Sequence, residues 1–210
     1  GIISPTGKTR IIDCPFIAEE EVSISDAIIG GSVILNKANF LNGLVADRMK
    51  TKRSLICDHG FCLKGNIRLV AAEIGGSVAF GLGSVVGALE ADRIKVTNEL
   101  RLGNKFSVDK DIRLSGAKVG GDIVFTGVDI NSSLIADGIE TPANLYLDRG
   151  LKVEGDVQIV DARLGGSLSF REASLMGTLN AERIEAGREL HLRQMRRLGA
   201  SNLCGAKVGG

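Results

Sequence analysis

Histidine and cysteine are the residue types in this sequence best suited to metal binding and acid–base catalysis, and both are few. The two histidines, His59 and His191, are 132 residues apart. A zinc site or a catalytic dyad needs such side chains close together on one face. The cysteines form no Cys-x-x-Cys pair and have no repeated spacing, so we expect unpaired thiols in a reducing compartment. They are Cys14, Cys57, Cys62 and Cys204. We therefore predict no catalytic residue, no metal site and no cofactor.

Three other segments have the composition of a ligand site. Residues 1–9 (GIISPTGKT) resemble the end of a phosphate-binding loop, but five residues separate the glycines where the motif has four. Residues 81–87 (GLGSVVG) have one residue too many for a dinucleotide-binding turn, and we assign their glycines to tight corners where a positive φ is useful. Residues 191–197 (HLRQMRR) are locally basic, which suits either a solvated corner or an anionic partner. None of the three identifies a ligand.

The dominant feature of the sequence is an internal repeat. Gly-Gly doublets begin at residues 30, 75, 120, 165 and 209, at intervals of 45, 45, 45 and 44 residues. The text around the first four repeats as IIGGSVIL, EIGGSVAF, KVGGDIVF and RLGGSLSF, and each is followed by LVADRMK, LEADRIK, LIADGIE or LNAERIE. A fixed period of this length indicates a repeat architecture, so the repeat must position any functional residue.

Inside each period the apolar residues pair as i and i+2, which puts both side chains on one face of an extended segment. No helical spacing is sustained. One period contains eight such pairs, which are Ile94/Val96, Leu100/Leu102, Phe106/Val108, Ile112/Leu114, Ala117/Val119, Ile123/Phe125, Val128/Ile130 and Leu134/Ala136.

The half-period decides how these eight short strands divide into coils. A shift of 22 or 23 residues superposes Val78 on Leu100 and Leu89 on Ile112. One coil is therefore about 22 residues with four sides, and about nine coils at roughly 4.8 Å give a rod on the order of 43 Å long. Parallel crossovers are right-handed. We predict an all-β fold: a right-handed parallel β-helix, or β-solenoid, with a 45-residue double-coil repeat.

Four segments resemble the Ala-x-Leu/Phe kernel of pentapeptide-repeat proteins, which are bacterial, four-sided, right-handed β-helices. They are residues 38–40 (ANF), 117–119 (AKV), 162–164 (ARL) and 173–175 (ASL). The resemblance covers about 200 residues and implies that small and large inward residues alternate. Bactofilin-like filament proteins, also β-helical with glycine-rich turns, are a second resemblance, although their coils are three-sided.

The residues between the inward pairs form columns along the sides of the rod. One column alternates in charge at six of its seven steps and predicts a solvated ladder of ion pairs; it reads Lys50, Glu73, Lys95, Lys118, Glu140, Arg163, Glu185, Lys207. A second reads Ile34, Ile56, Ala79, Arg101, Val124, Tyr146, Ser169, His191. Half of this second column is apolar. Either the preference of β-branched residues for strands or a binding face on this side of the rod would explain the apolar residues. We take Ile34, Ile56, Val124 and Tyr146 as the candidate interaction face.

Composition and charge bound the function. Net charge is +1 and no run of 18 apolar residues occurs, so we expect no nucleic-acid partner, no indication of a membrane surface and a cytoplasmic location. Residues 1–9 are assigned to an N-terminal extension and residues 10–210 to one solenoid. No cap is recognised, so we expect the terminal coils to be covered by further chain, a second copy or a partner.

The function expected from these observations is a non-catalytic binding or scaffold module, a rigid rod presenting flat faces to a protein partner. No small-molecule site is identified. Two alternatives remain: a self-assembling, filament- or oligomer-forming β-helix, and a glycan-processing or transferase enzyme. The regularity of the repeat is the feature that disfavours the enzyme, because it excludes the long loops that would form a groove.

Overall fold

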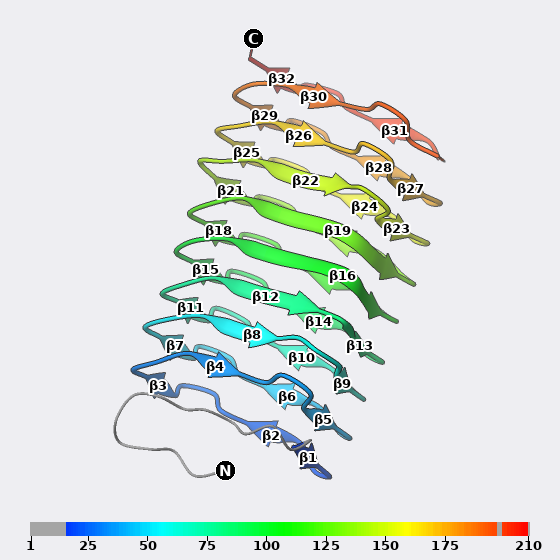
Figure 1. Cartoon of the computed structure of the whole chain (residues 1–210). Helices are drawn as coiled ribbons and strands as arrows, with labels where there is room; N and C mark the ends of the chain where they lie inside the picture. The colour runs from blue at the N-terminus through cyan, green and yellow to red at the C-terminus, as the bar shows by residue number, and fades with distance from the viewer. Residues whose placement is uncertain (1–15, 197–198, 210) are drawn as a thin grey trace.

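The computed structural model describes residues 16–196 and 199–209. These residues form short parallel strands stacked into a solenoid of nine coils, with the chain rising along the rod from its N-terminal to its C-terminal end (Figure 1). The strands nearest the viewer in Figure 1 run from left to right as the chain rises, so the coil is right-handed. The predicted β-helix is confirmed; the predicted extension, residues 1–9, lies outside the described residues.

Each coil has four sides, and the strands on one side stack into one face. Faces 1 and 2 merge into a single sheet because two long strands, β16 (Leu100–Val108) and β19 (Ile123–Ile130), run continuously around the corner between them. The remaining strands of face 1 are β4 (Val33–Ile34), β8 (Leu55–Cys57), β12 (Val78–Gly81), β22 (Leu145–Asp148), β26 (Leu168–Ser169) and β30 (Leu190–His191). Those of face 2 are β1 (Ile17–Ala18), β5 (Asn39–Phe40), β9 (Phe61–Leu63), β13 (Gly83–Val85), β23 (Lys152–Val153) and β27 (Ser174–Leu175).

Faces 3 and 4 are separate nine-stranded sheets. Face 3 consists of β2 (Val22–Ser23), β6 (Leu44–Val45), β10 (Ile67–Arg68), β14 (Leu89–Glu90), β17 (Ile112–Arg113), β20 (Leu134–Ile135), β24 (Val157–Gln158), β28 (Leu179–Asn180) and β31 (Ser201–Asn202). Face 4 consists of β3 (Ile28–Ile29), β7 (Lys50–Thr51), β11 (Glu73–Ile74), β15 (Lys95–Val96), β18 (Lys118–Val119), β21 (Glu140–Thr141), β25 (Arg163–Leu164), β29 (Glu185–Ala186) and β32 (Lys207–Val208).

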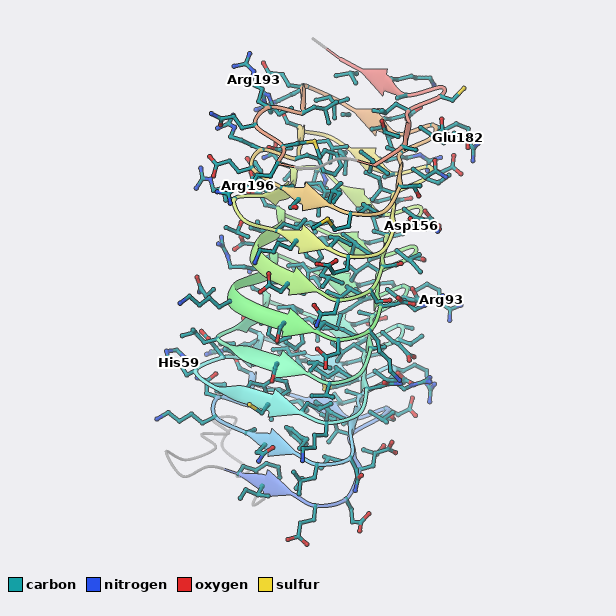
Figure 2. The ribbon with its side chains drawn as sticks, turned by 90° about the vertical axis from the view of Figure 1, so that its right-hand side faces the viewer. His59, Arg93, Asp156, Glu182, Arg193 and Arg196 are labelled. Carbon is teal, nitrogen blue, oxygen red and sulfur yellow. The ribbon has the colours of Figure 1, made fainter. Side chains whose placement is uncertain are left out.

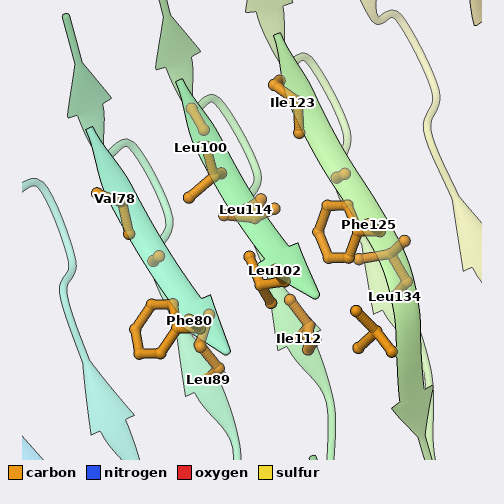
Figure 3. Packing of buried hydrophobic residues seen from close by; sticks show 14 of the residues in the cluster. Val78, Phe80, Leu89, Leu100, Leu102, Ile112, Leu114, Ile123, Phe125 and Leu134 are labelled. Carbon is orange, nitrogen blue, oxygen red and sulfur yellow. The ribbon is translucent and has the colours of Figure 1, made fainter. Parts of the chain in front are cut away.

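The 45-residue period has its cause in the core. Successive coils contain 22 and 23 residues in turn, as the pairing of Val78 with Leu100 and of Leu100 with Ile123 illustrates. On face 1 a phenylalanine of one coil is in register with a smaller residue of the next, as Phe80, Leu102 and Phe125 show (Figure 3), while across the corner Phe80 packs against Phe106 with ring centroids 5.3 Å apart. In several coils a small inward residue faces a large one across the corner from face 1 to face 2, which helps to fill the layer. The inward pairs there are Leu35/Ala38, Cys57/Phe61, Phe80/Gly83, Leu102/Phe106, Phe125/Val128, Leu147/Leu151 and Phe170/Ala173.

Two of the four corners depend on left-handed backbone. At the corner between faces 1 and 2 (corner 1–2), 22-residue coils have one residue with positive φ and 23-residue coils have two, such as Asn104 and Lys105 at 53° and 64°. The extra residue is a bulge that lets β16 stay continuous around the corner. At the corner between faces 3 and 4, every coil has positive φ, including Arg48, Ala71 and Arg93. These non-glycine residues are strained individually and held by the coils above and below.

The other two corners are tied by polar side chains. Ser54 Oγ accepts a hydrogen bond from the amide of Ser77 at 3.1 Å at the corner between faces 4 and 1. Asn66 Oδ1 accepts one from Ala88 at 3.0 Å at the corner between faces 2 and 3 (corner 2–3). The Asp of the repeated motif LxAD does the same near faces 3 and 4, where Asp92 Oδ1 accepts from the amide of Ser115 at 2.9 Å. These bonds hold successive coils in register, and they account for the polar residues that recur at fixed positions of the repeat.

A positive φ was predicted for the glycines of residues 81–87. In that segment, and in the glycine doublets, the structure gives a different reason why glycine is required. A Cβ added to Gly120 would lie 2.0 Å from the carbonyl oxygen of Thr97, and one added to Gly83 would lie 2.2 Å from that of Phe61. Neither glycine has positive φ; in residues 81–87 the residue that does is Leu82. The prediction for this segment was wrong, because close approach of the preceding coil, not backbone conformation, excludes a side chain there.

Candidate functional site

The column that contains the candidate interaction face lies on face 1, with each member paired in register to the next. Ile34 pairs with Ile56, and Val124 with Tyr146, on neighbouring coils. Ile34, Ile56 and Tyr146 are half-buried. Val124 is only 7% exposed. It was expected to be a solvent-facing member, but the flanking Arg101 and Tyr146 cover it, so it contributes little area to any contact.

A polar cluster borders this column toward corner 1–2. The Asp148 carboxylate accepts a hydrogen bond from Ser169 Oγ at 3.3 Å, and both residues are buried. Burial raises the pKa of Asp148 above its ordinary value, against the opposing effects of the Ser169 hydrogen bond and of Arg149 and Arg171. The two arginines act on Asp148 through their charge alone; Arg149 is exposed and Arg171 is half-buried.

The predicted charge ladder is present on face 4. Glu73 lies between two lysines, with Nζ–O distances of 3.1 Å to Lys50 and 3.4 Å to Lys95. Glu140 lies 2.8 Å from Lys118. The hydrogen bond from the neighbouring lysine, Lys50 or Lys118, is the main cause that lowers the pKa of each glutamate. Beside the ladder runs an open groove of about 680 Å³ whose floor includes Gly120. The doublet glycines leave this hollow because they have no side chains, and the ladder charges along it already pair with one another.

His59 and His191 lie six coils apart, and of the cysteines the structure describes Cys57, Cys62 and Cys204, whereas Cys14 lies outside the described residues. His59 lies at corner 1–2 with a φ of 55°, and His191 points outward from face 1, with Nε2 2.8 Å from Glu189. Cys57 is buried in the core, which raises the pKa of its thiol, whereas Cys62 and Cys204 are exposed; all three are free. Among residues 16–196 and 199–209 no three His, Cys, Asp or Glu side chains gather in a way that could hold a metal ion. In the same part of the chain, no helix has the length and hydropathy needed to cross a membrane.

Face 2 has surface features that were not recognised in the sequence. Of the seven large hydrophobic side chains exposed in the described chain, four lie on face 2 or at its edges, and none lies in the candidate column of face 1. They are Ile17, Leu82, Val86 and Met176. Corner residues break the i, i+2 pattern and look like turn residues in the sequence. A search for apolar residues at positions where other coils have polar ones would have found them.

The chain matches no protein-family model, no curated protein and no solved structure.

Proposed function

We propose that this protein is a non-catalytic scaffold module that presents face 1 to a protein partner. The observation that carries the proposal is the uniformity of the rod. In the described coils each corner is a few residues long and is fixed by hydrogen bonds to the neighbouring coil, as at Ser77 and Ala88. Such a surface offers flat, rigid faces, which suit contact with another folded protein.

The proposed contact on face 1 centres on Tyr146. Tyrosine supplies a large amphipathic surface at low conformational-entropy cost and is enriched where proteins bind one another. Tyr146 is half-buried and pairs in register with Val124 on the neighbouring strand, so part of its side chain is already packed before a partner arrives. Ile34 and Ile56 extend the apolar column several coils away. Because the proposed contact is preorganised, little side-chain entropy is lost on binding.

The proposal includes a relationship to pentapeptide-repeat-like bacterial β-helices and a cytoplasmic location. The alternation of Ala38 and Phe61, or of Phe170 and Ala173, at inward positions supports the first. Free thiols at Cys57 and Cys62 support the second, since unpaired cysteines are typical of reducing compartments.

The test is Tyr146→Lys in the full chain, compared with Lys118→Tyr on face 4 as a control for a general change in surface character. A bound partner is first identified by affinity capture under native conditions and then titrated against each variant. We expect Tyr146→Lys to weaken binding at least about tenfold, as loss of a central aromatic contact does, with the melting temperature unchanged. Binding that is indifferent to Tyr146→Lys would refute the assignment of face 1.

A further inference from the structure

The arrangement of charge and apolar surface about face 2 suggests how this protein associates with itself. Leu82 at corner 1–2 and Val86 at corner 2–3 belong to the same coil, and they are 48% and 53% exposed. They border the two edges of β13. Ile17, 57% exposed, lies in the middle of the same face near its lower end, and Met176 lies at corner 2–3 near its upper end. Exposed apolar side chains concentrated on one face are typical of an interface.

The edges of face 2 carry opposite charges. Figure 2 views this face directly, with His59 and Arg193 along its left edge and Asp156 along its right edge. At corner 1–2 the basic residues Lys37, Lys105, Arg149, Arg171 and Arg193 outnumber the acidic residues Asp58, Asp148 and Glu172. At corner 2–3 the acidic residues Asp109, Asp111, Glu154 and Asp156 outnumber the basic residues Lys64 and Lys110.

We propose that two copies of this chain form a parallel dimer through face 2, with coils in register and a two-fold axis along the rod. A two-fold axis in this direction exchanges the left and right edges of the face but keeps the height of every coil. Each basic edge then meets the acidic edge of the other copy. An antiparallel face-to-face dimer would place basic edge on basic edge, which is repulsive. The contacts that the parallel arrangement brings together, coil by coil, are Leu82 with Val86, Lys105 with Asp109, and Arg149 with Glu154.

The surface between the edges permits this approach. The outward residues at its centre include Asn39, Cys62, Ser84 and Ser107, which are all small. Further up, Asp129 and Lys152 form an ion pair across neighbouring strands at 3.3 Å. In the dimer each of these residues lies opposite the same residue of the other copy, and the ion pair offsets the repulsion between the like charges. Lys152 and the exposed Arg196, which stacks above Ser174, are the long side chains of this column, and the ion pair of Lys152 with Asp129 holds it along the face.

A shallow hollow of about 260 Å³ lies at the acidic edge, and Glu154 and Asp129 line it. In the parallel dimer it faces Arg149 of the second copy, whose guanidinium can bind a carboxylate through two hydrogen bonds. The size of the interface is also adequate. Eight coils spaced roughly 4.8 Å apart and about five residues of width give on the order of 600 Å² from each copy, near the lower end of specific interfaces.

The proposal does not depend on the partner face: Tyr146 lies on face 1 and remains free in the dimer. The first experiment is sedimentation velocity of the full chain across a concentration series, with Arg149→Glu, Glu154→Arg and the double variant Arg149→Glu/Glu154→Arg. Each single reversal creates two like-charge contacts in the dimer, and we expect the dissociation constant to rise at least about tenfold. The double variant restores opposite charges across the interface and should recover most of the affinity. Arg183→Glu, away from face 2, should leave it unchanged.

The second experiment fixes orientation and register with a short bismaleimide. Cys14 and Cys204 are replaced by Ser, and buried Cys57 is kept. Residues at the centre of face 2 lie opposite themselves in the dimer, so Cys62 should cross-link to Cys62. A cysteine moved to Ser84 or Ser107, in a Cys62→Ser background, should cross-link equally well. An antiparallel dimer would allow self-cross-linking at one height only, and Lys118→Cys on face 4 should give none.

The outcomes are decisive in both directions. Dimerisation with charge-swap rescue and self-cross-linking at all three heights establishes the proposal. A monomer at every concentration overturns it. So does an association that is insensitive to both charge reversals, or one that cross-links at a single height, as end-to-end stacking or an antiparallel pair would give.

Discussion

Alanine in place of the first glycine of a doublet should have opposite effects at two positions that the repeat makes equivalent. Gly120 and Gly30 occupy the same place in their coils, and neither has positive φ. At Gly120 an added Cβ would be 2.0 Å from the oxygen and 3.0 Å from the carbon of the Thr97 carbonyl. At Gly30 no described atom lies within 4 Å of the added Cβ. The structure therefore predicts that Gly120→Ala destabilises the protein and that Gly30→Ala does not.

The size of the destabilisation in Gly120→Ala depends on which atoms must move to make room for the added Cβ. The obstacle is backbone, so the corner of one coil must separate from the next. Two coil-to-coil hydrogen bonds then lengthen, from Gly120 to the carbonyl of Val96 at 2.8 Å and from Gly121 to that of Asn98 at 2.7 Å. Overpacking costs about 1–3 kcal/mol, and each bond contributes about 1 kcal/mol net. We expect about 2–4 kcal/mol of destabilisation. Gly30→Ala should stabilise by about 0.4–1 kcal/mol through the unfolded state.

Equilibrium unfolding in urea measures both effects as shifts in the midpoint at a constant slope. Hydrogen exchange provides the local check: the amides of Gly120 and Gly121 should lose protection in Gly120→Ala and keep it in Gly30→Ala. Equal destabilisation by the two variants would refute the reasoning. It would mean that the doublets are needed for their conformation in every coil and not for the space that the preceding coil leaves.

Two further predictions concern the core and the charge ladder. Leu114 is fully buried just after β17, so Leu114→Ala should lower the free energy of unfolding by about 2–5 kcal/mol. Arg113 points outward from β17, and Arg113→Ala should lower the free energy of unfolding by less than half as much. Equal losses in urea unfolding would contradict the assigned inward and outward faces. The pKa of Glu73 and of Glu140 is lowered below the ordinary 4.5 by their lysine partners, so the stability that each contributes is fully present above that value and is lost as pH falls through the folded-state pKa. Melting temperature measured from neutral pH downward should accordingly fall less steeply for Glu73→Gln than for the unsubstituted protein, and identical curves would show that the ladder is too well screened to matter.

The sequence alone determined the architecture, because a β-solenoid repeats its chemistry at every level of the stack. The i, i+2 pairs such as Leu100/Leu102 specify which side chains point inward, and the superposition of Val78 on Leu100 specifies the strand pairing that the structure contains. Ladder pairs such as Glu73 with Lys95 follow from the same register. These properties were predictable since each depends only on residues one coil apart, a distance that the period itself supplies.

The tertiary structure decided what depends on the distance between neighbouring corners and on the surface as a whole. Nothing in the sequence distinguishes Gly120 from a glycine needed for positive φ, because only the position of the Thr97 carbonyl shows that space is lacking. Val124 was expected to be exposed and is buried by its neighbours on adjacent coils. Likewise, Arg149 and Glu154 are five residues apart in the chain, and only the folded coil places them on opposite edges of face 2, one before and one after β23. Spacing along the chain determines register, whereas exposure and the segregation of charge arise from how the coils pack in three dimensions.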